Sequence, residues 1–183
     1  MPRTTTYRQR LWELALDRFG YVTTQDALDL GIPPKELPKL AEHEGLEHVA
    51  YGLYRFPHFP PTPLNQYAEA VLRIGGDAHL TGDAVLALHD LTPLAPKRVR
   101  VGVGRRTRAR LPEWITVQHE RVPDADITLY EGIPSTTVAR ALIDCKPYLM
   151  RTRLLDAVRA AREKGLLTGR EEREVLTELE DAP

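Results

Sequence analysis

Carboxylates, histidines and one serine are the residues of this chain that could support catalysis, and their spacing does not favour it. Asp124 and Asp126 form a D-x-D pair of the kind that binds metal ions, but no Gly-Ser motif precedes them at the distance that nucleotidyltransferases use. The six histidines are scattered, without H-x-x-x-H or H-E-x-x-H spacing. Ser135 lies outside a G-x-S-x-G setting and has no histidine nearby. The sequence therefore predicts no catalytic residue, no metal and no cofactor.

Two further features resemble chemical motifs only superficially. Gly102 and Gly104 lie beside cations, but no lysine-serine or lysine-threonine ending of a phosphate-binding loop follows them. Cys145 is the single cysteine, so the chain forms no internal disulfide and no thiolate cluster. Its neighbours repeat apolar residues at helical spacing, which predicts a small buried side chain.

Positive charge is concentrated in the middle of the chain, whereas the C-terminus is acidic. The cationic segment comprises Lys97, Arg98, Arg100, Arg105, Arg106, Arg108 and Arg110, with no acidic residue between them. The acidic residues near the end are Glu171, Glu172, Glu174, Glu178, Glu180 and Asp181. Three roles remain open for the cationic segment: a phosphate-binding surface, a contact with an acidic protein partner, or a solvated loop.

Residues 22–56 carry the clearest structural pattern, two short helices followed by a β-hairpin. Thr23 begins the first helix as a capping residue, and Gly31 with the prolines after it ends that helix. Leu37 and Leu40 mark the second helix, and a turn at Tyr51-Gly52 joins two short strands. An earlier helix is indicated by the spacing of Tyr7, Leu11, Leu14, Ala15 and Phe19. This order predicts a winged helix-turn-helix, a DNA-binding module. The alternative is a small helical subdomain whose hairpin serves only for packing.

The residues expected to contact DNA lie at the start of the first motif helix, on the second helix and on the hairpin. Short hydroxyls at a helix start suit phosphates, and hairpin residues reach the backbone or the minor groove. The predicted DNA-contacting residues are Thr23, Thr24, Gln25, Lys35, Lys39, His43, His48, Tyr51 and Arg55. For Lys39 and His43 a solvated surface position is an equal alternative. Tyr54 is predicted to be a core residue.

The rest of the chain predicts a second domain of mixed structure. Residues 57–63 contain four prolines and favour a stiff linker between residues 1–56 and residues 64–183. Strand-like alternation around Val101, Val117 and Leu129 lies between segments with helical spacing. The predicted fold class is α+β: an N-terminal winged helix-turn-helix, then an α+β domain whose small antiparallel sheet is flanked by helices.

Composition favours a soluble protein. No run approaches the roughly 18 apolar residues of a membrane span, and the polar residues 1–10 lack the apolar core of a signal peptide. The formal net charge is -1, which argues against nonspecific coating of nucleic acid. We therefore expect a cytoplasmic location and no membrane partner.

Four segments in order resemble the abortive-infection AbiEi-type antitoxins and their related transcriptional regulators. They are GYVTTQDA at 20–27 with Gly31-Ile32, LEHVAYGLYR at 46–55, LTGDAVLALHDL at 80–91 and GIPSTTVARALID at 132–144. Each segment alone is weak, but the ordered set covers most of the chain. The second motif helix departs from similar sequences, which are rich in arginine there, because it offers Lys35 and Lys39 against Glu36, Glu42 and Glu44.

The resemblance implies an antitoxin of a type IV-like toxin-antitoxin system that binds and represses its own promoter. It also implies that the C-terminal domain neutralises a nucleotidyltransferase-like toxin. Partners would be operator DNA and this toxin, with the protein acting as a monomer or as a weak dimer on paired half-sites. Two alternatives stay open: a protein-interaction module that neutralises a toxin without sequence-specific DNA binding, and a nuclease or nucleotidyltransferase that uses Asp124 and Asp126.

Overall fold

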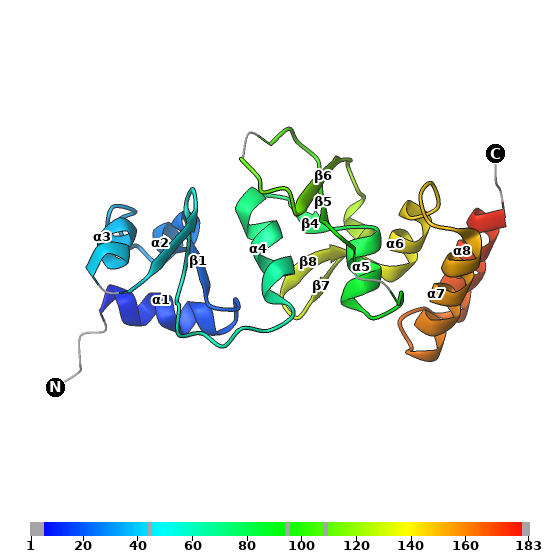
Figure 1. The fold of residues 1–183 in the computed structure, drawn as a ribbon, viewed down its shortest axis with the longest axis horizontal. Helices are drawn as coiled ribbons and strands as arrows, with labels where there is room; N and C mark the ends of the chain where they lie inside the picture. The colour runs from blue at the N-terminus through cyan, green and yellow to red at the C-terminus, as the bar shows by residue number, and fades with distance from the viewer. Residues whose placement is uncertain (1–5, 44, 94–95, 108–109, 181–183) are drawn as a thin grey trace. The chain divides into compact units, whose positions relative to one another are not determined.

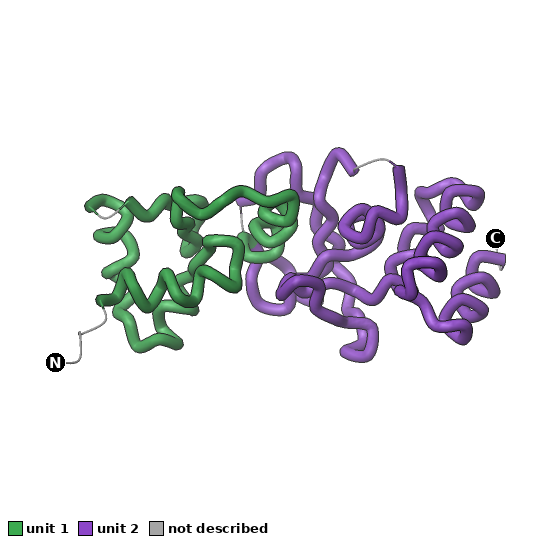
Figure 2. The backbone as a smooth tube through the Cα atoms, turned by 90° about the horizontal axis from the view of Figure 1, so that it is seen from below, with its two compact units in different colours: residues 1–73 green, residues 74–183 purple. Residues whose placement is uncertain are grey.

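The protein is a mixed α+β structure. A computed structural model describes residues 6–43, 45–93, 96–107 and 110–180. Within these residues it contains eight α-helices and two small sheets (Figure 1). The chain divides into two compact units, residues 1–73 and residues 74–183 (Figure 2).

Unit 1 begins with three helices interleaved with a three-stranded antiparallel sheet. Its first elements are α1 (Tyr7–Leu16), β1 (Tyr21–Thr23), α2 (Thr24–Asp29), α3 (Glu36–His43), β2 (Glu47–Ala50) and β3 (Leu53–Arg55). The strand order is β1-β3-β2, so the hairpin strand β3 lies in the middle. The helices and the hairpin lie where the sequence predicts them. Strand β1 was not predicted, because three residues are too few for a recognisable alternation.

Local side chains define the ends of α2. The Thr23 hydroxyl accepts a hydrogen bond from the backbone N–H of Asp26, and the Asp26 carboxylate accepts one from the Thr23 backbone. This reciprocal pair is the capping box that the sequence predicts. After the helix, Gly31 adopts a positive φ of 67°, a conformation that most side chains disfavour. The chain can therefore turn sharply between α2 and α3.

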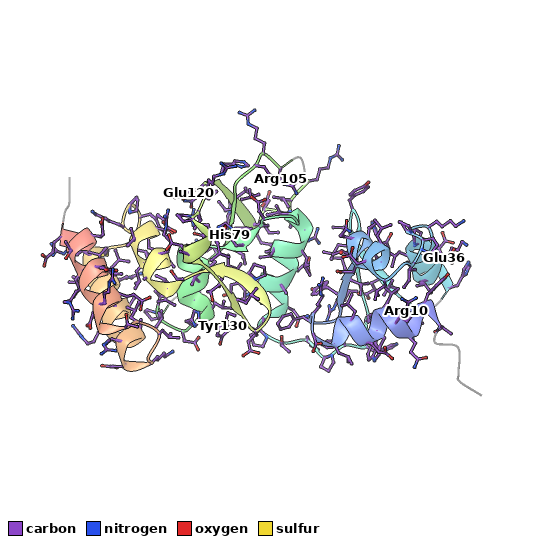
Figure 3. All side chains as sticks on the ribbon, turned by 180° about the vertical axis from the view of Figure 1, so that it is seen from behind. Arg10, Glu36, His79, Arg105, Glu120 and Tyr130 are labelled. Carbon is purple, nitrogen blue, oxygen red and sulfur yellow. The ribbon has the colours of Figure 1, made fainter. Side chains whose placement is uncertain are left out.

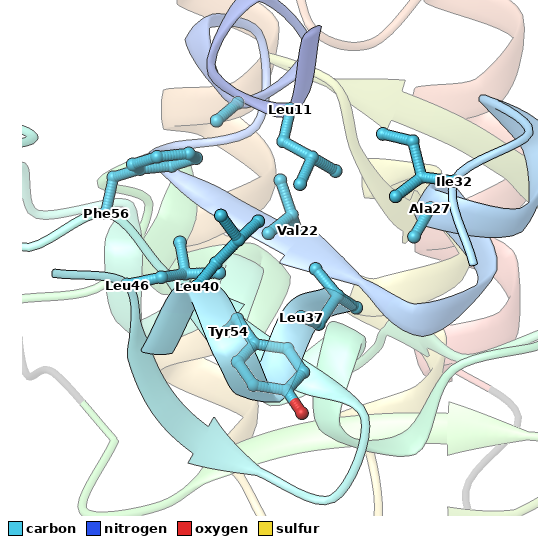
Figure 4. Close-up of a cluster of buried hydrophobic side chains, with 10 residues drawn as sticks. Leu11, Val22, Ala27, Ile32, Leu37, Leu40, Leu46, Tyr54 and Phe56 are labelled. Atoms are coloured by element: carbon cyan, nitrogen blue, oxygen red, sulfur yellow. The ribbon is translucent and has the colours of Figure 1, made fainter. Parts of the chain in front are cut away.

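The helices and the sheet of unit 1 share one apolar core. Leu11 from α1, Val22 from β1, Leu37 from α3 and Phe56 after β3 are at most 1% exposed (Figure 4). Tyr54 also belongs to this cluster, as predicted. Leucine and phenylalanine burial of this kind stabilises a fold by about 1.5–3 kcal/mol per side chain. The same core therefore fixes α3 and the hairpin against α1.

Helix α4 (Asn65–Ile74) extends unit 1 beyond the predicted domain boundary. The Tyr21 hydroxyl donates to Glu69 Oε2 at 2.8 Å, and Arg73 donates to the Val49 carbonyl at 3.2 Å. The prediction ended the first domain at residue 56 and assigned residues 64–183 to the second. The compact division instead falls after Arg73, because these long-range hydrogen bonds tie α4 to the strands of unit 1.

Unit 2 combines a five-stranded sheet with helices. Its strands are β4 (His79–Leu80), β5 (Val99–Val103), β6 (Ile115–His119), β7 (Ile127–Tyr130) and β8 (Ile133–Thr136). Its helices are α5 (Asp83–Leu88), α6 (Val138–Asp144), α7 (Arg151–Glu163) and α8 (Gly169–Glu180), with a 3-10 turn, η1, at Asp124–Asp126. The strand order is β6-β5-β4-β8-β7.

The prediction of a purely antiparallel sheet is wrong, because the sheet is mixed. Strands β5 and β6 pair in parallel, as do β4 and β8, whereas β4–β5 and β7–β8 pair antiparallel. Strands β4 and β8 were both missed. Strand β4 has only two residues, and Pro134 in β8 lacks the N–H that a central strand normally donates. The parallel β4–β8 pair could not be predicted without these two strands, whereas the parallel direction of β5 and β6 is a separate error of pairing.

One face of the sheet is apolar along β5. Val99, Val101 and Val103 are at most 4% exposed, as their alternation predicts. In the described parts of the chain, no helix is both long enough and apolar enough to cross a membrane.

Candidate nucleic-acid interface

The hairpin turn of unit 1 lies directly on the start of α2. The Thr24 backbone N–H donates to the Gly52 carbonyl at 2.9 Å, and the Thr24 hydroxyl contacts the same oxygen at 3.4 Å. Gly52 has a positive φ of 67°, as the predicted tight turn requires. Beside it, Tyr51 is fully exposed at 101% relative accessibility. The start of α2 and the hairpin tip therefore form one continuous surface.

All three predicted contact residues at the start of α2 have internal hydrogen bonds. The Thr23 hydroxyl caps the helix, and the Thr24 hydroxyl contacts Gly52. Gln25 is exposed, and its amide donates to Asp29 one turn later, at 2.8 Å. Thr23 and Thr24 thus hold the surface in shape, and Gln25 is the α2 residue whose side chain can reach a ligand.

The cations of α3 are exposed but accompanied by acids. Lys39 donates to Glu36 Oε1 at 2.9 Å, and His43 Nε2 lies 3.7 Å from Glu42. Lys35 precedes the helix and is exposed. Exposed ion pairs of this kind contribute only about 0–1 kcal/mol to stability. A DNA phosphate could therefore replace the acidic partner of Lys39 at low cost. The helix nevertheless lacks the concentrated positive charge of a strong DNA contact.

The remaining hairpin residues lie in an acidic groove. His48 and Arg55 line a groove of about 630 Å³ together with Glu42, Glu47 and Glu69. The Arg55 guanidinium lies over the Tyr21 ring, 5.8 Å from its centroid, and its buried Nε has no hydrogen-bond partner among the described residues. Arg55 therefore packs against Tyr21, whose aromatic face suits a guanidinium, and its contact with DNA stays a prediction.

The cationic segment of unit 2 is not one ribbon. Lys97 and Arg98 precede β5, whereas Arg105, Arg106 and Arg110 follow it. Five strand residues separate the two groups by about 16 Å. Arg100, within the strand, is held by Asp83 at 3.0 Å and lies over the Tyr148 ring at 4.5 Å. Arg108 lies outside the described residues. The cationic segment is therefore neutralised at Arg100, in the centre of β5.

The D-x-D pair lies in the 3-10 turn η1. Asp126 faces Arg140 at 3.7 Å, and Asp124 is exposed. Among the residues that the structure describes, no group of three or more His, Cys, Asp or Glu side chains could hold a metal ion. Figure 3 shows the side chains of the described residues, including Glu120, His79 and Arg105 on the β6-β5-β4 side of the sheet.

Arg140 is a residue that the sequence did not single out by itself. Its guanidinium contacts Glu120, Asp126 and Asp144, three carboxylates from three different segments. Asp144 is one helical turn away and is foreseeable at i+4 spacing. No local pattern links Arg140 to Glu120 or Asp126, because those contacts depend on the path of the chain across the sheet.

Comparison with known proteins finds weak structural similarity. No family model matches the chain. No curated protein matches it either. The crystal structure of the RV2827C protein from Mycobacterium tuberculosis is similar at 16% sequence identity and a TM-score of 0.43, over 96% of this chain and 82% of that chain. We therefore interpret the sites from their own geometry.

Proposed function

We propose that this protein is a DNA-binding antitoxin that represses its own promoter through unit 1 and neutralises a nucleotidyltransferase-like toxin through unit 2, without catalysis. The observation that carries the DNA-binding part is the order of elements in unit 1: helix, strand, two helices and a β-hairpin, in a β1-β3-β2 sheet. We infer that this order of elements forms a winged helix-turn-helix, in which the second motif helix enters the major groove.

The contacts of the hairpin support the same proposal. The bond from Thr24 to Gly52 fixes the hairpin tip beside α2, so Tyr51 and Gln25 can approach one ligand together. In this interface Lys35 and Lys39 bind phosphates from the side of α3. The AbiEi resemblance supports the toxin part and the autorepression. Thr23 and Thr24 position this surface rather than contact DNA.

A titration of the full chain against its own upstream DNA tests the DNA-binding part. Binding to this duplex and to a scrambled duplex is measured by fluorescence anisotropy across salt concentrations. We expect sequence-selective binding whose salt slope falls by about 0.9 for each phosphate contact removed, so by about 1.8 in the double variant Lys35→Ala/Lys39→Ala.

Arg159→Ala is the matched control for Lys39→Ala. Arg159 is also an exposed helical cation with an acid three residues before it, Asp156, at 3.4 Å. Its removal should leave both affinity and salt slope unchanged. Equal weak binding to both duplexes, unaltered by the double variant, would contradict the repressor function.

A protein-interaction module is the second candidate, favoured by the acids of α3 and of the groove beside it. Glu36 pairs with Lys39, and Glu42 and Glu47 line the groove that holds His48. These carboxylates repel phosphate, and they suit a cationic protein surface. The test is to co-express the Lys35→Ala/Lys39→Ala variant with the toxin encoded by the adjacent gene. If this second function is correct, the variant still neutralises the toxin although the variant does not bind DNA.

A further inference from the structure

Strand β6 forms one edge of the unit 2 sheet and has a neighbour on one side only. In the order β6-β5-β4-β8-β7 this neighbour is β5, and the two strands pair in parallel over all five residues of each. An edge strand presents a row of N–H and C=O groups that a further strand can join. What the outer side of β6 offers a partner therefore depends on which of its backbone groups are already bonded.

The pairing with β5 shows which backbone groups of β6 point outward. Before the strand the Trp114 carbonyl accepts a hydrogen bond from β5 at 2.7 Å, and after it the Glu120 N–H donates one to β5 at 3.2 Å. In a parallel ladder every second residue of a strand bonds to the same neighbour. The even-numbered residues therefore face β5. The residues whose backbone groups point to the outer side are Ile115, Val117 and His119.

Two of these outward residues have backbone groups without a hydrogen-bond partner in the described chain. The Ile115 N–H already donates to the Pro112 carbonyl at 3.1 Å. Val117 and His119 make no backbone hydrogen bond on this side with any described residue. Each offers one N–H donor and one C=O acceptor, in alternation along the edge. An extended peptide presents the same alternation, whereas the phosphates of a nucleic acid only accept. The free groups therefore suit a protein segment.

The other edge strands carry protection that β6 lacks. Strand β1 has three residues, and strand β2 has an irregular register whose Val49 carbonyl already accepts from Arg73 at 3.2 Å. Strand β7 has four residues, and the N–H of its Ile127 donates to the Asp124 carbonyl. Short strands and bulges are devices that prevent strand addition. Strand β6 has a continuous register and contains no proline and no Lys, Arg, Asp or Glu. Its outer side is therefore the most regular of these edges.

Positive charge gathers where β6 begins. Because β5 and β6 run in the same direction, the residues before β5 lie beside the start of β6. Lys97 and Arg98 precede β5, and Arg110 lies in the loop that leads into β6. All three are exposed and have no ion pair with a described residue. Glu113 is the single acid among residues 96–98 and 110–114. This end of the edge therefore attracts a negatively charged group.

Charges at the other end of β6 nearly balance. The cations there are Arg105, Arg106, Arg121 and Arg140, and the acids are Asp77, Glu120, Asp124, Asp126 and Asp144. A second copy of β6, added antiparallel, would bring this balanced end to the cationic start of the first. It would supply little negative charge there. An acidic segment of a different protein is therefore the better electrostatic match.

We propose that β6 receives an extended segment of a protein partner as a sixth strand of the sheet. The segment is uncharged where it pairs with Val117 and His119, and it carries acidic residues at the end that meets Lys97 and Arg98. Antiparallel pairing is the more stable geometry, so this acidic end is the C-terminal one. In strand addition, main-chain hydrogen bonds give affinity and side chains give specificity. The site belongs to unit 2 alone, so it holds whether or not unit 1 binds DNA and whether or not the partner is a toxin.

Amide hydrogen exchange of the full chain, followed by NMR, first tests whether the edge is free. The amides of Thr116 and Gln118 face β5, whereas those of Val117 and His119 face outward. We expect the first pair to exchange at least about tenfold more slowly than the second. Equal protection of all four amides would overturn the proposal, because the outer groups would then already be bonded.

Binding of the peptide acetyl-Thr-Val-Thr-Val-Glu-Glu-amide tests the chemistry of the partner. At saturation the peptide should slow the exchange of the Val117 and His119 amides about tenfold, because each gains a hydrogen bond. The same peptide N-methylated at its valines and threonines has lost its backbone donors and should bind about tenfold more weakly. Equal affinity of the two peptides would rule out strand addition.

Two double variants separate this edge from general electrostatic attraction. Lys97→Gln/Arg98→Gln should weaken binding of the acidic peptide about threefold, because it removes two exposed charges beside the start of β6. Arg159→Gln/Arg173→Gln removes two exposed cations of α7 and α8 and should leave the affinity unchanged. Equal effects of the two double variants would contradict the placement of the acidic end. A single-stranded oligothymidylate should bind more weakly than the peptide. Tighter binding of the oligothymidylate, with unaltered exchange at Val117 and His119, would assign the cations to a nucleic acid and overturn the proposal.

Discussion

At the scale of single residues, Cys145 shows how burial removes reactivity. The thiol is fully buried and lies 3.3 Å from the Tyr148 hydroxyl, which in turn accepts from the Asp83 backbone N–H at 3.3 Å. The predicted burial of Cys145 is confirmed. Burial raises the pKa of this thiol to about 12 and also raises the pKa of Tyr148. The group is therefore a packed, neutral part of the core.

The free energy of unfolding should fall as pH rises from about 9 to 12. In the unfolded chain a cysteine ionises near 8.5, whereas the folded thiol stays protonated to about 12. The folded state then binds more protons than the unfolded state, so stability is complete below the unfolded pKa and is lost through this window. The slope for one such group is about 1.4 kcal/mol per pH unit.

Urea denaturation at a series of pH values measures this slope. Cys145→Ala should reduce the slope of the unfolding free energy against pH in the range below pH 10. In that range tyrosines do not yet ionise in the unfolded chain. Tyr7→Phe is the control, because Tyr7 is 42% exposed. A slope that Cys145→Ala leaves unaltered would contradict the assignment.

At the scale of elements, Arg140 joins helix α6 to residues 120–126, the segment that crosses the sheet between the edge strands β6 and β7. It contacts Glu120 at the start of the crossing segment and Asp126 at its end, and it donates to Asp144 at 2.7 Å within α6. Thr137 N–H also donates to the Asp126 carbonyl at 2.8 Å. The start of α6 and the crossing segment therefore form one connected element.

Arg140→Ala should destabilise unit 2 by about 3 kcal/mol, because it leaves a buried carboxylate without its cation. Asp144 is 6% exposed at its side chain and keeps only the Thr81 hydroxyl as a further hydrogen-bond partner among the described residues. The pKa of Asp144 is already raised by burial and rises further without Arg140. The loss should therefore grow as pH rises above about 4, where an ordinary carboxyl ionises.

Chemical denaturation at pH 4 and pH 7 checks both the size and the direction of this effect. Arg159→Ala, at an exposed helical ion pair, should cost less than about 1 kcal/mol at either pH. A deficit for Arg140→Ala that is equal at the two pH values would show that lost packing, not the buried charge, dominates.

At the scale of the whole molecule, the division between the two units depends on α4. The proline-rich residues 57–63 resemble a linker in sequence, but α4 beyond them belongs to unit 1. Tyr21, Glu69 and Arg73 connect it to the strands through hydrogen bonds. Burial, together with the bond to Glu69, raises the pKa of Tyr21 to about 12.

A fragment of residues 1–76 should therefore be more stable than a fragment of residues 1–63. The shorter fragment loses two hydrogen bonds to charged side chains, each worth about 1.5–3 kcal/mol. Thermal melting followed by circular dichroism compares the two, with Tyr21→Phe in the longer fragment as an intermediate case. Identical melting temperatures would place the boundary at the proline-rich segment after all.

The sequence by itself determined the features that depend on neighbours along the chain. The capping box at Thr23, the turn at Gly52 and the apolar alternation of Val99, Val101 and Val103 all lie where it predicts them. Each is governed by backbone conformation or by side-chain periodicity within a few residues. The helices and the hairpin of unit 1 are predictable for the same reason.

Only the tertiary structure decided which distant residues meet. The mixed direction of the second sheet, the three acids around Arg140 and the edge position of β6 depend on segments far apart in sequence. It also packed Arg55 against Tyr21 and used the hydroxyls of Thr23 and Thr24 inside unit 1. Long-range contacts depend on strand order and on the packing of whole elements, and neither leaves a periodic trace in the local sequence.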